Sequence, residues 1–265
     1  MTSPAVSVLM GVHNGAPWVR EAVMSVLTQT APDLELIVID DASDDATPDL
    51  LAAVSDLRLR VERPRNREGL TRALNRALGM ARAPLVARLD ADDMALPERF
   101  ARQRAVFDAQ PAIGLLGTGA QEVDASGFAV AVLRPPADDA GIRRALIRRN
   151  PFVHSSVMAR RSIVEQAGGY DPRFPVAQDY DLWMRVSRLS RLANVPEPLV
   201  IRRLLPGRVS ESREDDRLRA EARIRWRAVR RGDYPAWCAI HALRPALALA
   251  LPPSFRRMLR RRLHG

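Results

Sequence analysis

Hydrophobic and polar positions along the first hundred residues follow the pattern of an α/β protein. The apolar runs Val6–Val12 and Leu34–Ile39 are nearly continuous, as in parallel strands that are buried on both faces. Apolar and charged residues alternate over Leu57–Val61, which predicts a strand with one solvated face. A further apolar run at Leu85–Leu89 completes four strands of a mostly parallel central sheet.

Segments with helical spacing separate these strands. A helix is expected after Pro17, because apolar residues recur at helical intervals up to Leu27 and proline is tolerated in a first turn. Thr47 and Pro48 supply an N-cap and first position for a second helix, and Leu70–Leu78 predicts a third. Strands that alternate with helices predict a sheet covered by helices on both faces.

The alternation loosens after the first hundred residues. A helix that carries Phe100 and Phe107 is expected after Pro97, followed by a strand at Ile113–Thr118. Asp124–Gly127 has the turn chemistry of a hairpin. Residues 153–205 mix short strands with two helices, and from about residue 211 the chain becomes helical and basic.

Composition agrees with one sizeable α/β domain and an appendage. The chain has 265 residues, of which 47% are hydrophobic. Its one cysteine, Cys238, can form no internal disulfide, and no His/Cys cluster has zinc spacing, so metal chemistry would use oxygen ligands. The N-terminus has no signal-peptide pattern and no segment is apolar for long enough to span a bilayer. We therefore expect a cytoplasmic setting.

The basic residues are all arginine and are concentrated at the C-terminal end. The formal net charge is +10, and the sequence from Arg217 onward contains thirteen arginines but only two acidic residues, Glu221 and Asp233. Anionic lipid or nucleic acid would suit that charge. The apolar residues after Pro235 and the Arg256–Arg262 tail favour equally a helix in a membrane interface and a docking helix with a solvated basic end.

Acidic residues gather where the expected strands end. Asp40 and Asp41 follow the second strand, and Asp90-Ala-Asp92-Asp93 follows the fourth. In open α/β sheets ligands bind beyond the carboxyl ends of the strands. Three carboxylates within four residues repel one another unless a cation or hydrogen-bond donors neutralise them. Mg²⁺ and Mn²⁺ take one or two carboxylates and complete their shell with substrate phosphates and water.

Each acidic group also has a structural interpretation. The Asp40–Asp45 segment has the composition of an Asx-rich turn that caps the next helix, and the aspartates after Leu89 would suit a solvated loop. Asp179 and Asp181 open a later helix, whose N-terminus favours acidic side chains by ~0.3–1 kcal/mol each. The positions of these groups at strand ends favour the binding interpretation.

Several short motifs occur in a specific order. They are Val6–Asn14, Gln29-Thr30, Leu36–Thr47, Gly69-Leu70 with Ala73–Asn75, Ala87–Asp93, Asn150–Met158, Gly168–Asp171 and Gln178–Trp183. Together they cover about residues 5–210 and resemble the motifs of inverting family 2 glycosyltransferases, which have the GT-A fold. The resemblance implies residues 1–210 as the catalytic domain, with a nucleotide-sugar half to about residue 115 and an acceptor half from 116, followed by a basic helical extension, residues 211–265.

The resemblance also implies roles for individual residues. Asp41 would accept a hydrogen bond from the base, Asp92 would ligate Mn²⁺ or Mg²⁺ with Asp90 close to the ribose and diphosphate, and Asp179 would be the general base. The other residues implied at the nucleotide are Gly11, His13, Asn14, Arg67 and Arg88. Those implied at the acceptor are Asp124, His154, Asp181 and Trp183.

The implied reaction moves a sugar from a UDP-, dTDP- or GDP-sugar to a hydroxyl of a glycan or lipid-linked acceptor, in cell-surface polysaccharide or lipopolysaccharide synthesis. The protein would be cytoplasmic, or peripheral on the inner face of the membrane through its arginine-rich tail, with no nucleic acid partner. A positioned carboxylate that takes the hydroxyl proton contributes ~10²–10⁴-fold. Two alternatives are a nucleotidyltransferase, which normally has a Gly-rich basic loop after the first strand, and a non-catalytic nucleotide-sugar or nucleic-acid binding module.

The chain departs from the family pattern at four positions. Gly11 and His13 stand where proline and tyrosine are usual, although an imidazole can still stack on a base. Gln178 replaces the glutamate that usually precedes the base. Leu205 takes the place of a histidine that completes the metal shell in many relatives, so we expect modest metal affinity. Gly114, Gly117 and Gly119 do not have the spacing of a dinucleotide fingerprint.

Overall fold

A curved mixed sheet forms the centre of the molecule. The computed structural model describes residues 3–205 and 213–250, and within them nine strands form one sheet in the order β3-β2-β1-β4-β8-β6-β9-β5, with β7 paired to β6. The strands are β1 Val6–Val12, β2 Leu34–Asp40, β3 Leu59–Glu62, β4 Leu85–Arg88, β5 Met94–Ala95, β6 Ile113–Val123, β7 Ala129–Leu133, β8 Met158–Arg160 and β9 Arg191–Arg203.

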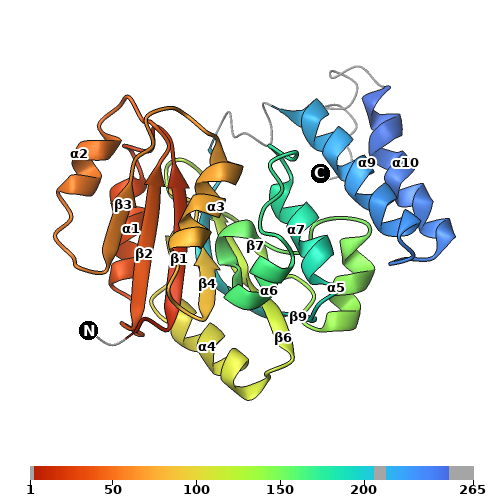
Figure 1. Cartoon of the computed structure of the whole chain (residues 1–265), viewed down its shortest axis with the longest axis horizontal. Helices are drawn as coiled ribbons and strands as arrows, with labels where there is room; N and C mark the ends of the chain where they lie inside the picture. The colour runs from red at the N-terminus through yellow and green to blue at the C-terminus, as the bar shows by residue number, and fades with distance from the viewer. Residues whose placement is uncertain (1–2, 206–212, 251–265) are drawn as a thin grey trace.

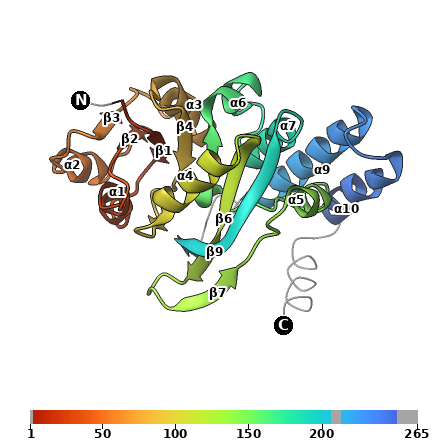
Figure 2. The same cartoon turned by 90° about the horizontal axis from the view of Figure 1, so that it is seen from below.

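The first four strands are parallel, as the sequence predicts. β1 lies between β2 and β4, and β3 extends the sheet beyond β2 (Figure 1). Beyond β4 the sheet becomes mixed, because β8 runs antiparallel to both β4 and β6, whereas β9 is parallel to β6. The expected hairpin at Asp124–Gly127 joins β6 to β7, which projects from the sheet in Figure 2.

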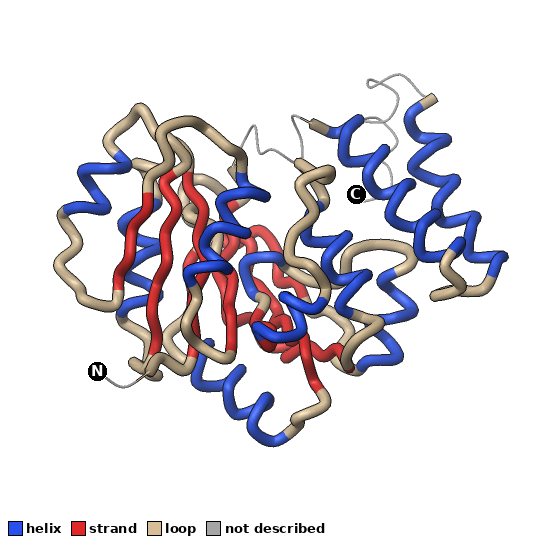
Figure 3. The backbone as a smooth tube through the Cα atoms, viewed as in Figure 1, coloured by secondary structure: helices blue, strands red, loops and turns tan. Residues whose placement is uncertain are grey.

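Helices flank this sheet on both sides (Figure 3). They are α1 Val19–Leu27, α2 Thr47–Ala52, α3 Leu70–Met80, α4 Arg99–Ala109, α5 Asp139–Leu146, α6 Arg161–Gln166, α7 Gln178–Val186, α9 Glu214–Arg230 and α10 Ile240–Leu249, with 3-10 helices at His154–Ser156 and Ala236–Ala239. Two boundaries differ slightly from the prediction. Ala46, not Thr47, is the N-cap residue of α2, and β3 begins at Leu59 because Leu57 is 84% exposed.

Each face of the sheet has its own core. Val8 and Met10 of β1 pack with the apolar sides of α1 and α4, whereas Leu9 belongs to the core on the opposite face, which includes α3, α5 and α7. Successive residues of a strand point to opposite faces, so a continuous apolar run serves both layers. This explains why the β1 and β2 segments show little polar alternation.

The C-terminal helices continue the second core. Ala220, Ile224 and Ala228 of α9 are buried in the same cluster as Trp183 and Tyr180 of α7, and α10 packs alongside α9 (Figures 1 and 2). The expected domain boundary near residue 210 stays a prediction. The basic tail predicted at 256–262 lies outside the described residues. Within the described part of the chain, no helix is long and apolar enough to cross a bilayer.

Candidate active site

The loops that follow β1 and β2 form one end of the site. Val12 of β1 pairs with Asp40 of β2, so both strands end at the same edge of the sheet. Both carboxylate oxygens of Asp41 accept hydrogen bonds from backbone amides, Oδ1 from Glu68 at 2.6 Å and Oδ2 from Gly69 at 2.8 Å. Asp41 thereby holds the turn into α3. A carboxylate has about four lone-pair sites, so it can still accept from a ligand.

His13 and Asn14 connect the two loops. The carbonyl oxygen of Asp41 can only accept, so His13 Nδ1 donates the 2.9 Å hydrogen bond between them, and Nε2 is the acceptor nitrogen of the neutral ring. Asn14 has a φ of 55°, in the left-handed region that asparagine tolerates. Its side chain exchanges two hydrogen bonds with Asp44, from Nδ2 to Oδ1 at 2.6 Å and from the Asp44 amide at 3.0 Å.

Gly11 and Arg67 flank this end in different ways. A Cβ at Gly11 would lie 3.0 Å from Leu70 Cδ1, so glycine lets β1 and the start of α3 approach closely. Arg67 is exposed next to the amides that Asp41 binds. Roles for both at a nucleotide stay predictions.

Asp90 follows β4, on the other side of β1. Its Oδ2 accepts a 2.7 Å hydrogen bond from Ser155 Oγ, and its Oδ1 pairs with the Arg88 guanidinium. Burial is the largest single influence and opposes ionisation of Asp90, but the Arg88 charge, the Ser155 hydrogen bond and the other positive groups nearby together hold the Asp90 pKa below its ordinary value. Asp90 is therefore the ionised member of the carboxylate group.

The pKa values of Asp92 and Asp93 are shifted upward, opposite to that of Asp90. Burial and the charge of Asp90 raise the pKa of Asp92 to about 6, and burial with the charges of both neighbours raises that of Asp93 to about 7. Asp93 is 3% exposed and faces inward, where its Oδ1 accepts the Arg203 amide at 2.9 Å. Asp93 is therefore a buried structural carboxyl.

Ser155 holds Asp90 and Asp93 together. Its hydroxyl accepts from the Asp90 amide at 3.2 Å and lies within hydrogen-bond distance of a carboxylate oxygen of each aspartate. The Ser155 hydroxyl has a single proton and cannot donate to both aspartates. All contacts are satisfied if Ser155 donates to Asp90 and Asp93 is protonated and donates to the Ser155 oxygen. The raised pKa of Asp93 agrees with this arrangement.

A divalent cation fits Asp92 better than Asp93. Among the described residues no other side chain bonds the Asp92 carboxylate, whose hydrogen bond is to its own backbone, and the group is partly buried beside a second negative charge. No group of three or more potential ligand side chains occurs within residues 3–205 and 213–250. The residues present thus fit a hard cation that takes one or two carboxylates and otherwise phosphate and water.

Asp179 lies in the first turn of α7. Its Oδ2 accepts a 2.7 Å hydrogen bond from Asn150 Nδ2, while Asn150 Oδ1 accepts from the Phe152 amide at 3.1 Å. Ala177, the N-cap residue, has a φ of 56°. The left-handed residue and the asparagine together set where the Asp179 carboxylate lies.

His154 and Tyr170 form a pair close to both catalytic candidates. His154 Nε2 and the Tyr170 hydroxyl form a 3.0 Å hydrogen bond. Burial, and then the Arg88 charge, lower the His154 pKa, whereas the charges of Asp179 and Asp90 act in the opposite direction. His154 is therefore neutral near pH 7. Its ring packs against Trp183 of α7, the helix that carries Asp179, and the neighbouring Ser155 bonds Asp90.

Four predicted residues have structural contacts that limit their direct role. Arg88 is 2% exposed and its guanidinium bonds the Leu9 and Leu89 carbonyls and Asp90, and its place beside the nucleotide stays a prediction. Trp183 is 2% exposed and packs edge-on against His154, and its contact with the acceptor stays a prediction.

The other two of these residues, Asp124 and Asp181, have hydrogen-bonded carboxylates. Asp124 Oδ1 accepts the Ser126 amide at 2.8 Å and the Phe128 amide at 3.0 Å, which is a hairpin-turn arrangement. Asp181 Oδ2 accepts from Arg185 at 2.9 and 2.8 Å. Both arrangements match the structural interpretations of these positions, and an acceptor role for either stays a prediction.

Sequence reasoning did not single out four residues that build the site. Ser155, Asn150 and Tyr170 lie within the recognised motifs but were given no role of their own. Arg203 donates to the Asp92 carbonyl at 2.7 Å and to Glu21 Oε2 at 2.5 Å. The only sequence signal for these contacts is motif membership, because the partners are far apart along the chain.

Comparisons with known proteins agree with this geometry. A family model described as glycosyl transferase family 2 matches residues 7–168. The chain is 32% identical over 190 residues to the putative glycosyltransferase EpsE of Bacillus subtilis, which covers 69% of this chain and 67% of that protein. It is 31% identical over 183 residues to the O-antigen biosynthesis glycosyltransferase WbnJ of Escherichia coli, covering 68% and 71%.

Solved structures share the fold. Residues 1–349 of S. aureus TarS in complex with UDP-GlcNAc match with a TM-score of 0.69 and 19% identity, over 83% of this chain and 66% of that one. The mannosyltransferase PcManGT of Pyrobaculum calidifontis, in complex with GDP-Man and Mn²⁺, matches with a TM-score of 0.66 and 21% identity, over 94% and 76%. The predicted GT-A-type fold is confirmed, and the chain spans about two thirds of the length of EpsE and of the TarS fragment.

The family model covers more than half of the chain, and the sheet edge carries the aspartates that the family motifs contain. The chain therefore belongs to glycosyl transferase family 2 and is a glycosyltransferase.

Proposed function

We propose that the protein transfers a sugar from a nucleotide-sugar donor to an acceptor hydroxyl with inversion at the anomeric carbon. The observation that carries this proposal is the convergence of carboxylates from two halves of the fold. Asp41 and Asp90 flank the end of β1, and the His154–Ser156 turn, which bonds Asp90, also packs His154 against Trp183 of α7, the helix that carries Asp179.

Asp179 is the proposed general base. It takes the proton of the acceptor hydroxyl as the oxygen attacks the anomeric carbon, a role worth ~10²–10⁴-fold in rate. The bond from the anomeric carbon to the diphosphate oxygen breaks in the same displacement, so no covalent sugar intermediate forms. Asn150 positions the base through its 2.7 Å hydrogen bond, and neutral His154 with Tyr170 borders the space between base and donor.

Asp92, with Asp90 beside it, is the proposed protein anchor for Mn²⁺ or Mg²⁺. A bound cation supplies Lewis-acid neutralisation of the charge that gathers on the departing nucleoside diphosphate. Asp41, His13, Asn14, Gly11 and Arg67 are proposed to bind the nucleoside, with Asp41 accepting from the base. Leu205 offers no ligand atom, so we expect weak metal binding in the absence of donor.

The base assignment is tested with the variant Asp179→Asn. Transfer should fall at least 100-fold while donor binding, measured as a thermal shift with UDP-, dTDP- and GDP-sugars in Mn²⁺, persists. Asp108→Asn is the matched control, because Asp108 is exposed on α4 away from the site. Unchanged turnover in Asp179→Asn would remove the assignment. Pyrophosphate release from a nucleoside triphosphate would instead indicate a nucleotidyltransferase.

The acceptor is proposed to be a glycan or lipid-linked glycan in cell-surface polysaccharide synthesis. The support comes from the relatives, whose names include O-antigen biosynthesis for WbnJ and amylovoran biosynthesis for AmsE of Erwinia amylovora, which is 32% identical over 157 residues. This chain belongs to the same family as these relatives, but the sugars that they transfer are not assigned to it. The charge and apolar surface of the C-terminal helices add a separate argument.

We further propose that α10 lies against an anionic membrane surface. Ile240, Leu243 and Leu247 lie on one helical face and are 58%, 53% and 68% exposed, with Trp237 one turn earlier at 67%. No acidic residue follows Asp233 in the sequence, whereas six arginines do. A helix with an exposed apolar face, a tryptophan and basic neighbours suits the lipid interface, where each basic residue gains ~1 kcal/mol.

Vesicle flotation tests this surface. The wild type should bind vesicles that contain phosphatidylglycerol and should not bind phosphatidylcholine vesicles, and Ile240→Asn with Leu247→Asn should abolish binding. Leu57→Asn is the control, because Leu57 is equally apolar and 84% exposed near β3. Binding that survives the double variant contradicts the proposal, and a concentration-dependent dimer lost in that variant would assign the face to a second copy of the chain.

A further inference from the structure

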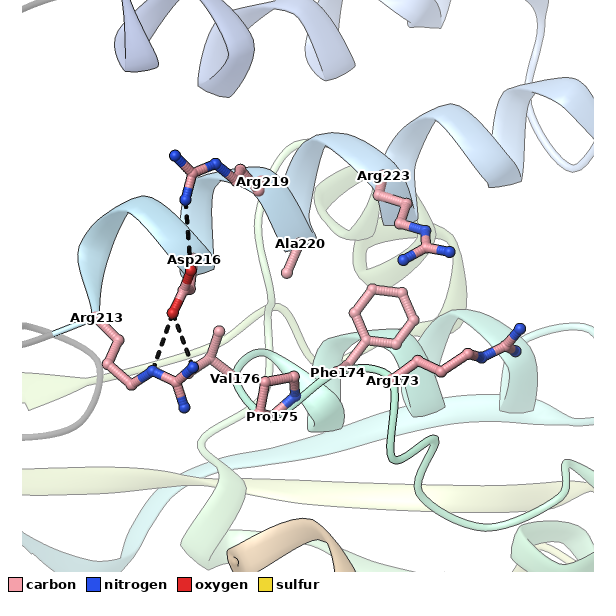
Figure 4. A pocket seen from close by; sticks show the side chains of 9 residues that line it. All are labelled: Arg173, Phe174, Pro175, Val176, Arg213, Asp216, Arg219, Ala220 and Arg223. Carbon is pink, nitrogen blue, oxygen red and sulfur yellow. Dashed lines mark hydrogen bonds and ion pairs between the residues drawn. The ribbon is translucent and has the colours of Figure 1, made fainter.

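A hollow lies between α9 and the loop that leads into α7. It has a volume of about 190 Å³ and is lined by Arg173, Phe174, Pro175, Val176, Arg213, Asp216, Arg219, Ala220 and Arg223 (Figure 4). The loop is anchored to the sheet layer, because Thr71 of α3 donates a 3.1 Å hydrogen bond to the Phe174 carbonyl. The described residues thus form a hollow between two anchored elements.

The lining carries an excess of positive charge. Four arginines face a single acidic side chain, Asp216, which pairs with Arg213 at 2.8 Å and with Arg219 at 3.4 Å. Arg173 pairs with Asp171 at 2.8 Å. Within the described part of the chain, Arg223 has no carboxylate partner, and its guanidinium lies 5.6 Å from the centre of the Phe174 ring. The hollow therefore has unneutralised charge available for an anion.

A fifth arginine strengthens the local field. The guanidinium of Arg227, one turn along α9 from Arg223, lies 5.2 Å from the centre of the Phe174 ring. Burial, and then the charges of Arg223 and Arg173, lower the pKa of Arg227. Neighbouring cations that repel one another are stabilised when an anion binds among them.

The floor of the hollow is apolar and rigid. Phe174, Val176 and Ala220 are 1%, 5% and 9% exposed, whereas the arginines stand around the rim with exposed side chains. Figure 4 shows the arginine side chains coming from both the α9 side and the loop side. A planar guanidinium can bind two phosphate oxygens at once, so several arginines around a small hollow suit a phosphate or diphosphate group.

The hollow is close to the proposed base. Val176 in its lining precedes Asp179 by three residues, a stretch that spans at most about 11 Å. The donor diphosphate is expected instead beside Asp90 and Asp92, at the end of β4. An anion between α9 and α7 would therefore lie on the acceptor side of the site.

We propose that this arginine hollow binds a phosphate or diphosphate group carried by the acceptor, and thereby selects acceptors that are phosphorylated next to the sugar that is attacked. The proposal rests on the proposed glycosyltransferase function and identifies the chemical class of its acceptor. The acceptor phosphate would be held by Arg219 and Arg223, while the attacked hydroxyl lies at Asp179. A neutral glycan would lack this anchor.

Binding of decyl diphosphate tests the proposal without any transfer reaction. The titration is done in EDTA and without donor, so that no metal-dependent diphosphate site competes. Wild type should bind the probe saturably, and Arg219→Ala with Arg223→Ala should weaken binding at least tenfold. Arg230→Ala with Arg231→Ala is the matched control, because it removes the same two charges at the end of α9, about 10 Å along the helix from Arg223, and should change binding less than twofold.

Three results would overturn the inference. The first is equal binding of a neutral decyl glycoside, and the second is equal weakening by Arg230→Ala with Arg231→Ala, which would make the effect one of net charge. In the third, the double variant loses binding to phosphatidylglycerol vesicles but keeps its affinity for decyl diphosphate, which would assign the arginines to bilayer headgroups. Donor hydrolysis by the double variant is a separate readout, and it should match wild type, so loss of the transferase function and loss of the hollow are distinguishable.

Discussion

Replacement of Asn150 by alanine isolates the positioning of the proposed base. Asn150 gives Asp179 the one side-chain hydrogen bond that the described residues supply, at 2.7 Å, and leaves the rest of α7 untouched. A hydrogen bond to a charged group contributes about 1.5–3 kcal/mol. If the carboxylate must be held to accept the hydroxyl proton, that loss corresponds to about a 10–100-fold decrease in kcat.

Stability should change less than activity. Alanine also frees the Phe152 amide, which bonds Asn150 Oδ1 at 3.1 Å, so we expect a loss of about 1 kcal/mol and a decrease of about 2–4 °C in Tm. Steady-state kinetics should show a lower kcat with the donor KM within about twofold, because Asn150 bonds the proposed base and the proposed donor site lies beside Asp41 and Asp90. Asn66→Ala, an exposed asparagine, is the control.

The variant Asn150→Asp distinguishes positioning from simple packing. Aspartate has nearly the same shape but brings a second negative charge to within hydrogen-bond distance of Asp179, which disfavours two ionised carboxylates. Its kcat should therefore be lower than that of Asn150→Ala at neutral pH. A kcat equal to wild type in Asn150→Ala, or higher activity in Asn150→Asp than in the alanine variant, would refute the reasoning.

Three further predictions concern the stability contributed by Glu35, the hold of Arg203 on the Asp92 backbone, and the metal. Glu35 is 1% exposed. Burial opposes its ionisation, but hydrogen bonds from Ser7 and two arginines lower its pKa below the ordinary 4.5. The ionised carboxylate therefore stabilises the fold at pH values above 4.5, and this stabilisation is lost as the pH falls through the lower pKa of the folded state. Glu35→Gln should lower Tm by about 4–8 °C at neutral pH, and calorimetry should show this difference shrinking on acidification; a constant difference would contradict it. Arg203→Lys should decrease turnover about tenfold with an almost unchanged Tm. Lysine lacks the planar guanidinium whose two nitrogens donate to the Asp92 carbonyl and to Glu21. Turnover equal to that of the wild type would show that this pair of hydrogen bonds is dispensable. EDTA should abolish transfer and Mn²⁺ or Mg²⁺ restore it, with Asp92→Asn raising the metal concentration for half activity at least tenfold; restoration at the same concentration would exclude Asp92 as the anchor.

The strands and helices of the first half were predictable because their signals are local. Continuous apolar runs at β1 and β2 and helical spacing in α3 depend only on neighbouring residues, and the structure has each element within two or three residues of its expected position. The ends of β2 and β4 follow from the same signals. Parallel strands that flank β1 place Asp41 and Asp90 at one edge, so their proximity follows from strand order.

The direction in which each acidic side chain points was not predictable. Asp92 and Asp93 are adjacent in a polar segment, yet Asp93 turns inward to the Arg203 amide, 110 residues away, and to Ser155, 62 residues away. Such contacts form because β9 pairs with β5, which begins directly after Asp93, and the 3-10 turn at His154–Ser156 packs against β4. No local pattern of hydrophobic and polar residues encodes that packing.

The sequence by itself determined the fold class, the family and the edge of the sheet that carries the carboxylates, because periodicity and motif order are properties of the chain read in one dimension. Tertiary structure alone decided that Arg88 is buried under Asp90, that Trp183 supports His154 from within, and that arginines of α9 meet the loop before α7. Each of these depends on which surfaces meet once hydrophobic burial has brought distant segments together.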